Sequence, residues 1–110
     1  MHRLDPQQTL DALRAGALVV DIRPVHQREG TGTIKGAIQI DRTVLEWRLD
    51  PASSAALTEA DHDAHVVLIC QQGYASSLAA DTLRSLGVHR ATDLAGGVDA
   101  WLQQGLPLER

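Results

Sequence analysis

Four short segments, one wholly aliphatic and three with one or two polar residues, stand between polar or glycine-containing segments of the chain. They cover residues 17–22, 37–40, 66–69 and 91–94, and the run at 66–69 reads Val-Val-Leu-Ile. Continuous aliphatic residues over four to six positions are typical of strands that a parallel sheet buries on both faces. We therefore predict four strands, of which 66–69 is the clearest.

Most of the segments between these predicted strands contain residues that typically begin, continue or end a helix. Asp5 and Pro6 suit the cap and first position of a helix, and Gly16 suits its end. Further helices are predicted over residues 44–49, 54–60, 76–86 and 98–104, with residues 23–36 as a loop. The helix over 76–86 is expected to place Leu78, Ala79, Leu83 and Leu86 on one side.

Strands that alternate with helices indicate an α/β domain with a mainly parallel sheet. The length of 110 residues suits a single domain over 1–110, and a hydrophobic content of 44% is typical of a globular protein. Phe is absent, so Val, Leu, Ile and Ala must build the core.

Charge and cysteine content narrow the class of protein. A net charge of -4 argues against a nucleic-acid or anionic-membrane partner. No apolar run approaches the roughly 20 residues that span a bilayer, and the polar N-terminus lacks a signal region. A single cysteine excludes an intrachain disulfide. We therefore expect a cytoplasmic protein.

The segment that carries chemistry follows the run at 66–69. Cys70 ends this strand, a loop with Gly73 follows, and a helix is expected to begin at Ser76. Ligand sites of open parallel sheets lie outside the carboxyl ends of the strands, where this order places Cys70. If the loop curls back, its N–H groups and the following helix N-terminus stabilise a thiolate or a persulfide.

This loop resembles the active-site loop of rhodaneses, in which a cysteine opens a six-residue ring ahead of a helix. Other segments resemble the family in the same order along essentially the whole chain: VDIR at 20–23, IKGA at 34–37, LAGG at 94–97, then Trp101 and GLP at 105–107. The resemblance implies a rhodanese-like α/β fold of about five mainly parallel strands, flanked by helices on both faces. It also implies a short first strand near Arg3 and Leu4.

The resemblance further implies a sulfurtransferase with Cys70 as its catalytic nucleophile. The thiolate takes the outer sulfur of thiosulfate or of a persulfide, and the Cys70 persulfide passes it to cyanide or to a thiol. Because Cys70 is the sole cysteine, the acceptor must come from outside the chain, as a small thiol or as a protein of a sulfur relay. No cofactor and no metal are implied.

The substrate-binding candidates include only two cations. Many family members carry a cation in the loop where this chain has Ala75, and a histidine where it has Thr33. We therefore predict weak affinity for the thiosulfate dianion, unless Arg28 or Arg42 reaches the mouth of the site. The full set of candidates is Gln71, Gln72, Gly73, Tyr74, Ala75, Ser76, Arg28 and Arg42.

The loop residues also have structural interpretations. A free cysteine is often a core residue, but the loop and helix after Cys70 favour a reactive one. Tyr74 either lines a pocket or covers the loop. Gln71 and Gln72 either donate hydrogen bonds to an oxyanion or face solvent. Ser76 is expected to cap the helix rather than to react.

Charged residues elsewhere are assigned structural roles. Asp21 and Arg23 are expected to pair or to anchor loops, and His26 is expected to face solvent. No zinc site is predicted at the turn that holds Asp61, His62, Asp63 and His65, because it has no cysteine partner.

Two other function classes compete with the sulfurtransferase. A cysteine-dependent phosphatase needs an arginine six residues after its nucleophile to clamp phosphate, and Ser76 stands there. The remaining alternative is a non-catalytic rhodanese-like module for partner binding or thiol redox sensing, which the loop without a cation leaves open.

Overall fold

A computed structural model describes residues 2–109 and contains a four-stranded sheet in the order β2-β1-β3-β4. All three strand pairs are parallel, with Val20 opposite both Ile38 and Leu68. Every side chain of β3 is buried, which explains its uninterrupted apolar sequence. The strands are β1 (Leu18–Asp21), β2 (Ile38–Gln39), β3 (Val66–Ile69) and β4 (Ala91–Asp93).

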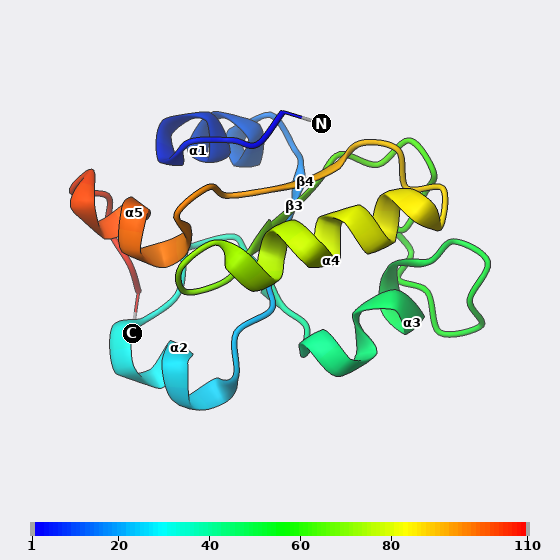
Figure 1. The fold of residues 1–110 in the computed structure, drawn as a ribbon, viewed down its shortest axis with the longest axis horizontal. Helices are drawn as coiled ribbons and strands as arrows, with labels where there is room; N and C mark the ends of the chain where they lie inside the picture. Colours follow the sequence, from blue (N-terminus) through cyan, green and yellow to red (C-terminus); the bar gives the residue numbers. More distant parts are fainter. Residues whose placement is uncertain (1, 110) are drawn as a thin grey trace.

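Helices cover both faces of this sheet (Figure 1). Alternate strand residues point to opposite faces, so Val20 and Leu68 pack with α3 and α4, whereas Val19 and Val67 pack with α1 and α5. The helices are α1 (Pro6–Arg14), α2 (Val25–Thr31), α3 (Leu45–Leu49), α4 (Tyr74–Ser85) and α5 (Gly97–Gln103), with a 3-10 turn η1 (Arg42–Val44) before α3. In the described part of the chain, no helix has the length and apolar character of a membrane span.

The start of α1 follows the predicted capping pattern. The Asp5 carboxylate accepts from the Gln8 N–H at 2.7 Å, and the Gln8 side chain accepts from the Asp5 N–H at 2.9 Å. This capping box satisfies two N–H groups, and Pro6 occupies the first position, where no donor is needed.

The expected first strand is reduced to a single bridge. Leu4 pairs with Leu94 in parallel, donating to Asp93 O at 3.0 Å and accepting from Ala95 N at 2.8 Å. The pairing stops there because Asp5 and Pro6 turn the chain into α1 at once.

Three predictions of local structure outside the Cys70 loop are wrong. Residues 23–36 contain the helix α2 rather than only a loop. Residues 54–60 form turns rather than a helix, where the Ser53 side chain accepts from the Ala55 N–H and competes with helical bonding. Leu78 is 71% exposed, because α4 buries Ala79 and Leu83 instead.

Candidate active site

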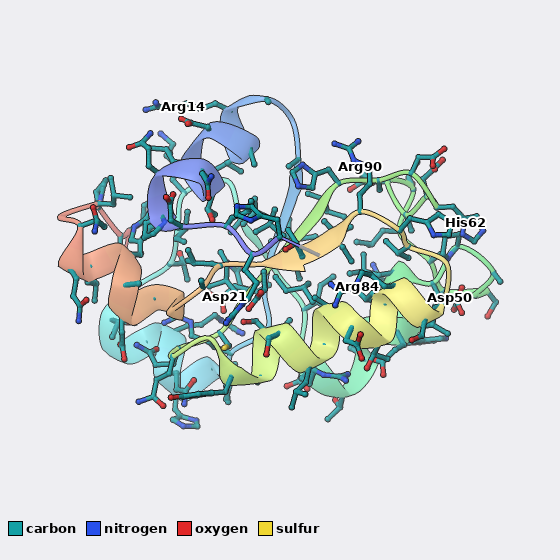
Figure 2. All side chains as sticks on the ribbon, turned by 45° about the horizontal axis from the view of Figure 1, so that its top comes forward. Arg14, Asp21, Asp50, His62, Arg84 and Arg90 are labelled. Atoms are coloured by element: carbon teal, nitrogen blue, oxygen red, sulfur yellow. The ribbon has the colours of Figure 1, made fainter. Side chains whose placement is uncertain are left out.

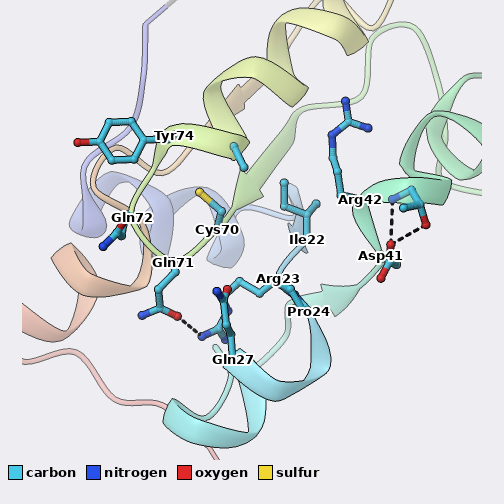
Figure 3. Close-up of a pocket in the computed structure, with 12 residues that line it drawn as sticks. Ile22, Arg23, Pro24, Gln27, Asp41, Arg42, Cys70, Gln71, Gln72 and Tyr74 are labelled. Carbon is cyan, nitrogen blue, oxygen red and sulfur yellow. Dashed lines mark hydrogen bonds between the residues drawn. The ribbon is translucent and has the colours of Figure 1, made fainter.

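Cys70 follows β3 directly and lies at the carboxyl end of the sheet, 7% exposed. It opens onto a pocket of about 650 Å³ between the loop, η1 and the segment after β1 (Figure 3). The residues that line the pocket are Ile22, Arg23, Pro24, Gln27, Asp41, Arg42, Thr43, Cys70, Gln71, Gln72, Tyr74 and Ala75.

The loop curls around the sulfur. Cys70 Sγ accepts from the N–H groups of Gly73 at 3.1 Å and of Ser76 at 3.3 Å. Gly73 has a φ of 91°, a left-handed conformation that glycine adopts without strain, and this turn brings the start of α4 over the sulfur. Two N–H donors and the positive end of a twelve-residue helix favour an anionic sulfur.

Further N–H groups of the same loop are free. Among the residues described, the backbone N–H groups of Gln71, Gln72, Tyr74 and Ala75 make no hydrogen bond to a protein acceptor. All four residues line the pocket. The loop therefore offers unpaired donors where an anionic substrate or the outer sulfur of a persulfide would lie.

Ser76 belongs to α4 and does not cap it. The helix begins at Tyr74, so the Ser76 side chain turns inward, fully buried. Its hydroxyl donates to Asp93 Oδ2 at 2.6 Å and accepts from the Cys70 thiol at 3.2 Å. A hydroxyl has one proton, so its strong bond to the carboxylate leaves it an acceptor for the thiol.

Asp93 also binds Arg3, from the other end of the chain. Arg3 Nε donates to Asp93 Oδ1 at 2.8 Å, and Arg3 Nη2 donates both to Asp93 Oδ2 at 2.9 Å and to Gly73 O at 2.7 Å. Hydrogen bonding to Asp93 raises the pKa of Arg3 above its ordinary value. Sequence analysis missed both residues, because their sequence surroundings contain no signal of this contact.

On the opposite side of the loop, Asp21 and Arg23 form the expected buried ion pair at 2.8 Å. Arg23 also donates to Gln71 Oε1 at 3.0 Å, and the Gln71 amide donates to Asp99 Oδ1 at 2.7 Å. The Gln71 side chain is therefore held by protein groups on both sides and is not turned to a substrate. Only its backbone N–H stays available.

The start of α5 supports the loop from behind. Cys70 O accepts from Val98 N and Gln71 O from Asp99 N, each at 3.0 Å. These bonds satisfy first-turn N–H groups of α5, and they turn the two carbonyls away from the pocket. Gly97 allows the approach, since a Cβ there would lie 2.3 Å from Cys70 O.

The two candidate cations differ in their position relative to the pocket. Arg42 lines the pocket and stands across it from Cys70 (Figure 3), paired with Glu46 at 2.5 Å. Arg28 is not one of the lining residues, because its guanidinium donates to Arg23 O at 2.7 Å. Of the two arginines proposed for the mouth of the site, it is therefore Arg42 that lines this pocket.

The pocket has little net positive charge. Its two lining cations, Arg23 and Arg42, are each paired with a carboxylate. Asp41 also lines the pocket, and hydrogen bonds from Thr43 hold the pKa of Asp41 below its ordinary value, so that it stays ionised. Ala75 lines the pocket where a loop cation would stand.

Most of the remaining candidate residues are exposed to solvent. Tyr74 is 76% exposed at the rim, and Gln72 is exposed as well. His26 is exposed and does not line the pocket. Thr33 makes a backbone bridge with Glu109. Residues 2–109 contain no cluster of side chains that would hold a metal, the turn at 61–65 included.

The chain matches the Rhodanese-like domain family over residues 5–104, and it belongs to this family. It is 36% identical over 101 residues to thiosulfate sulfurtransferase GlpE of Pseudomonas entomophila, a match that covers 90% of this chain and 83% of that protein. It is also 36% identical over 86 residues, 78% of this chain, to adenylyltransferase and sulfurtransferase MOCS3-2 of Zea mays. The chain spans only 17% and 18% of that protein and its maize homologue MOCS3-1.

Solved structures confirm the predicted fold. The human single-domain sulfurtransferase TSTD1 aligns with a TM-score of 0.77 and 28% identity, over 93% of this chain and 96% of that one. RPA3614 of Rhodopseudomonas palustris, described as a possible tyrosine phosphatase, aligns with a TM-score of 0.88 and 30% identity, over 99% and 85%. This chain has Ser76 where a phosphatase needs its arginine. The GlpE and TSTD1 relatives are both named sulfurtransferases.

Proposed function

We propose that this chain transfers sulfane sulfur through a persulfide on Cys70. The observation that carries the proposal is the loop geometry, in which two N–H groups bond Sγ and four further pocket-lining residues have N–H groups without a protein acceptor. The first pair stabilises the attacking thiolate, and the free donors suit the outer sulfur once it is bound.

The proposed chemistry has two steps. The Cys70 thiolate attacks the outer sulfur of the donor, an S–S bond forms, and the donor's own S–S bond breaks. The leaving group departs with the electron pair, as sulfite from thiosulfate or as a thiolate from an organic persulfide. An acceptor thiolate or cyanide then attacks the terminal sulfur and regenerates the Cys70 thiolate.

We propose an organic persulfide as the preferred donor and a thiol as the acceptor. The pocket volume of about 650 Å³ is within the range of sites for organic ligands. Its wall includes Ile22, Pro24 and Ala75, and its cations are already paired with carboxylates. Such a pocket suits an organic group beside the sulfur better than a small dianion. A reducing compartment such as the cytoplasm supplies such thiols, and a sulfur-carrying protein is an alternative acceptor of the same chemistry.

Intact mass spectrometry tests the carrier role directly. Reduced protein is treated with cysteine persulfide or with thiosulfate, beside Cys70→Ser as the control. We expect a Cys70-dependent gain of about 32 Da, one sulfur atom, with more complete loading by the persulfide. A folded wild type that gains no sulfur from either donor refutes the proposal and favours a partner-binding module. Sulfenic acid or a mixed disulfide without persulfide would favour a redox sensor.

A second experiment tests the reason for the donor preference. Ala75→Arg places a cation among the free N–H groups, and Ala75→Gln adds a side chain without charge. We expect the arginine variant to lower the KM for thiosulfate about tenfold, because a charge-assisted bond to the dianion is gained. An equal KM in wild type, Ala75→Arg and Ala75→Gln would contradict this account of specificity.

A further inference from the structure

Three carbonyl groups of the active-site loop are held by groups outside the loop. Those of Cys70 and Gln71 bond N–H groups at the start of α5. The carbonyl of Gly73 instead bonds Arg3 Nη2 at 2.7 Å. Arg3 thus holds the carbonyl of Gly73, the residue whose N–H bonds the sulfur, from outside the loop.

This bond sets the orientation of a whole peptide group. The Gly73–Tyr74 peptide is trans, so its N–H points opposite to its C=O. With Gly73 O fixed on Arg3, the Tyr74 N–H is directed away from Arg3, and Tyr74 lines the pocket. Arg3 therefore helps to direct one of the free donors toward the substrate.

The same guanidinium acts on the loop a second time through Asp93. Asp93 is 2% exposed, accepts two bonds from Arg3, and receives the Ser76 hydroxyl at 2.6 Å. Arg3 and Asp93, hereafter the clamp, thus hold Gly73 by its carbonyl and Ser76 by its side chain. These are the two residues whose N–H groups bond the Cys70 sulfur.

We propose that Arg3 is a positioning residue for Cys70, which acts by clamping the loop with Asp93 so that both N–H groups stay on the sulfur. The proposal rests on the proposed function in taking Cys70 as the nucleophile. The clamp acts by geometry rather than by net charge, because the carboxylate of Asp93 balances the guanidinium. The fork of arginine is needed, since a lysine is a point charge that cannot hold a carboxylate and a carbonyl in fixed directions.

The test is the pH dependence of Cys70 alkylation by iodoacetamide in Arg3→Lys. We expect the midpoint of the rate profile to move up by about one pH unit, because the N–H donors that favour the thiolate are less well held. Persulfide formation at pH 7 should slow about tenfold for the same reason. A midpoint equal to that of the wild type overturns the proposal.

The matched control is Arg84→Lys. Arg84 also bonds a carbonyl, Ala91 O of β4, at 2.9 Å, but it lies on the C-terminal half of α4, away from Asp21 at the strand ends (Figure 2). We expect its alkylation midpoint to equal that of the wild type. If the alkylation midpoint of Arg84→Lys shifts upward as much as that of Arg3→Lys, loss of any arginine–carbonyl bond disturbs the loop. That result would overturn the assignment of Arg3 as a positioning residue.

A double variant keeps the test valid if Arg3→Lys folds poorly. Arg3→Gln with Asp93→Asn removes both charges together, so no buried charge is left unpaired and the net charge beside the sulfur is unchanged. We expect the same upward shift in thermally stable protein, and an unchanged midpoint would overturn the proposal. Alkylation needs no sulfur donor, so a wild type that alkylates normally but takes up no sulfur would refute the proposed function and leave the clamp intact.

Discussion

Gly97 provides a sharp test of how closely the active-site loop is supported. This glycine opens α5 with a φ of 62°, and a Cβ added there would lie 2.3 Å from Cys70 O and 2.6 Å from Gln71 O. Both neighbours are backbone atoms, which cannot swing aside as a flexible side chain does. Gly97→Ala must therefore push the loop and α5 apart.

The size of the effect follows from a comparison with Gly105. Gly105 has a similar φ of 74°, but nothing lies within 4 Å of the added Cβ. Gly105→Ala should lower the free energy of unfolding by about 1–2 kcal/mol, the cost of a left-handed conformation for an L-residue. Gly97→Ala carries that cost and a further ~1–3 kcal/mol of overpacking, because ordinary contacts begin at 3.4 Å. The cost of the left-handed conformation is nearly the same in the two variants. The difference between their losses in free energy of unfolding therefore measures the close contact of residue 97 with the loop.

Urea unfolding followed by the fluorescence of buried Trp101 measures both variants. The rate of Cys70 alkylation at pH 7 measures the loop, and we expect it to fall in Gly97→Ala and to stay unchanged in Gly105→Ala. Equal loss of stability in the two variants, with equal alkylation, would refute the argument that Gly97 sets the position of the loop.

Three further predictions concern buried or titrating groups. Asp21→Asn should lower the free energy of unfolding by about 3–5 kcal/mol in urea titrations, because Arg23, whose side chain is 0% exposed, loses its counter-charge. Ser76→Ala should cost about 1–3 kcal/mol in the same assay, because the buried Asp93 carboxylate loses its hydroxyl donor. Burial lowers the pKa of His65 from its usual 6.5, so the unfolded chain binds a proton more readily and stability falls as pH drops below that value. Urea titrations at pH 7.5 and 5 should show a smaller loss for His65→Gln than for the wild type, and an equal loss would contradict this.

Much of the fold was predictable because it rests on local patterns. The aliphatic runs at 17–22 and 66–69 became neighbouring strands, and Asp5 with Pro6 began a helix, since periodicity and capping act within a few residues. Cys70 at a strand end before a glycine loop was enough to propose the site, and the structure places Cys70 at a pocket there. The turns at 54–60 were missed because short polar side chains bond their own backbone there.

The sequence by itself thus determined the four strands, four of the five helices of the described residues, the position of Cys70 at a strand end and the absence of a cation in the loop. Tertiary structure alone decided what surrounds the sulfur. Arg3 and Asp93 are 90 positions apart, Arg23 and Gln71 are 48 apart, and neither pair has a local sequence signal. Such contacts exist only once the parallel strands have brought their carboxyl ends to one edge, because parallel pairing joins segments that are distant along the chain.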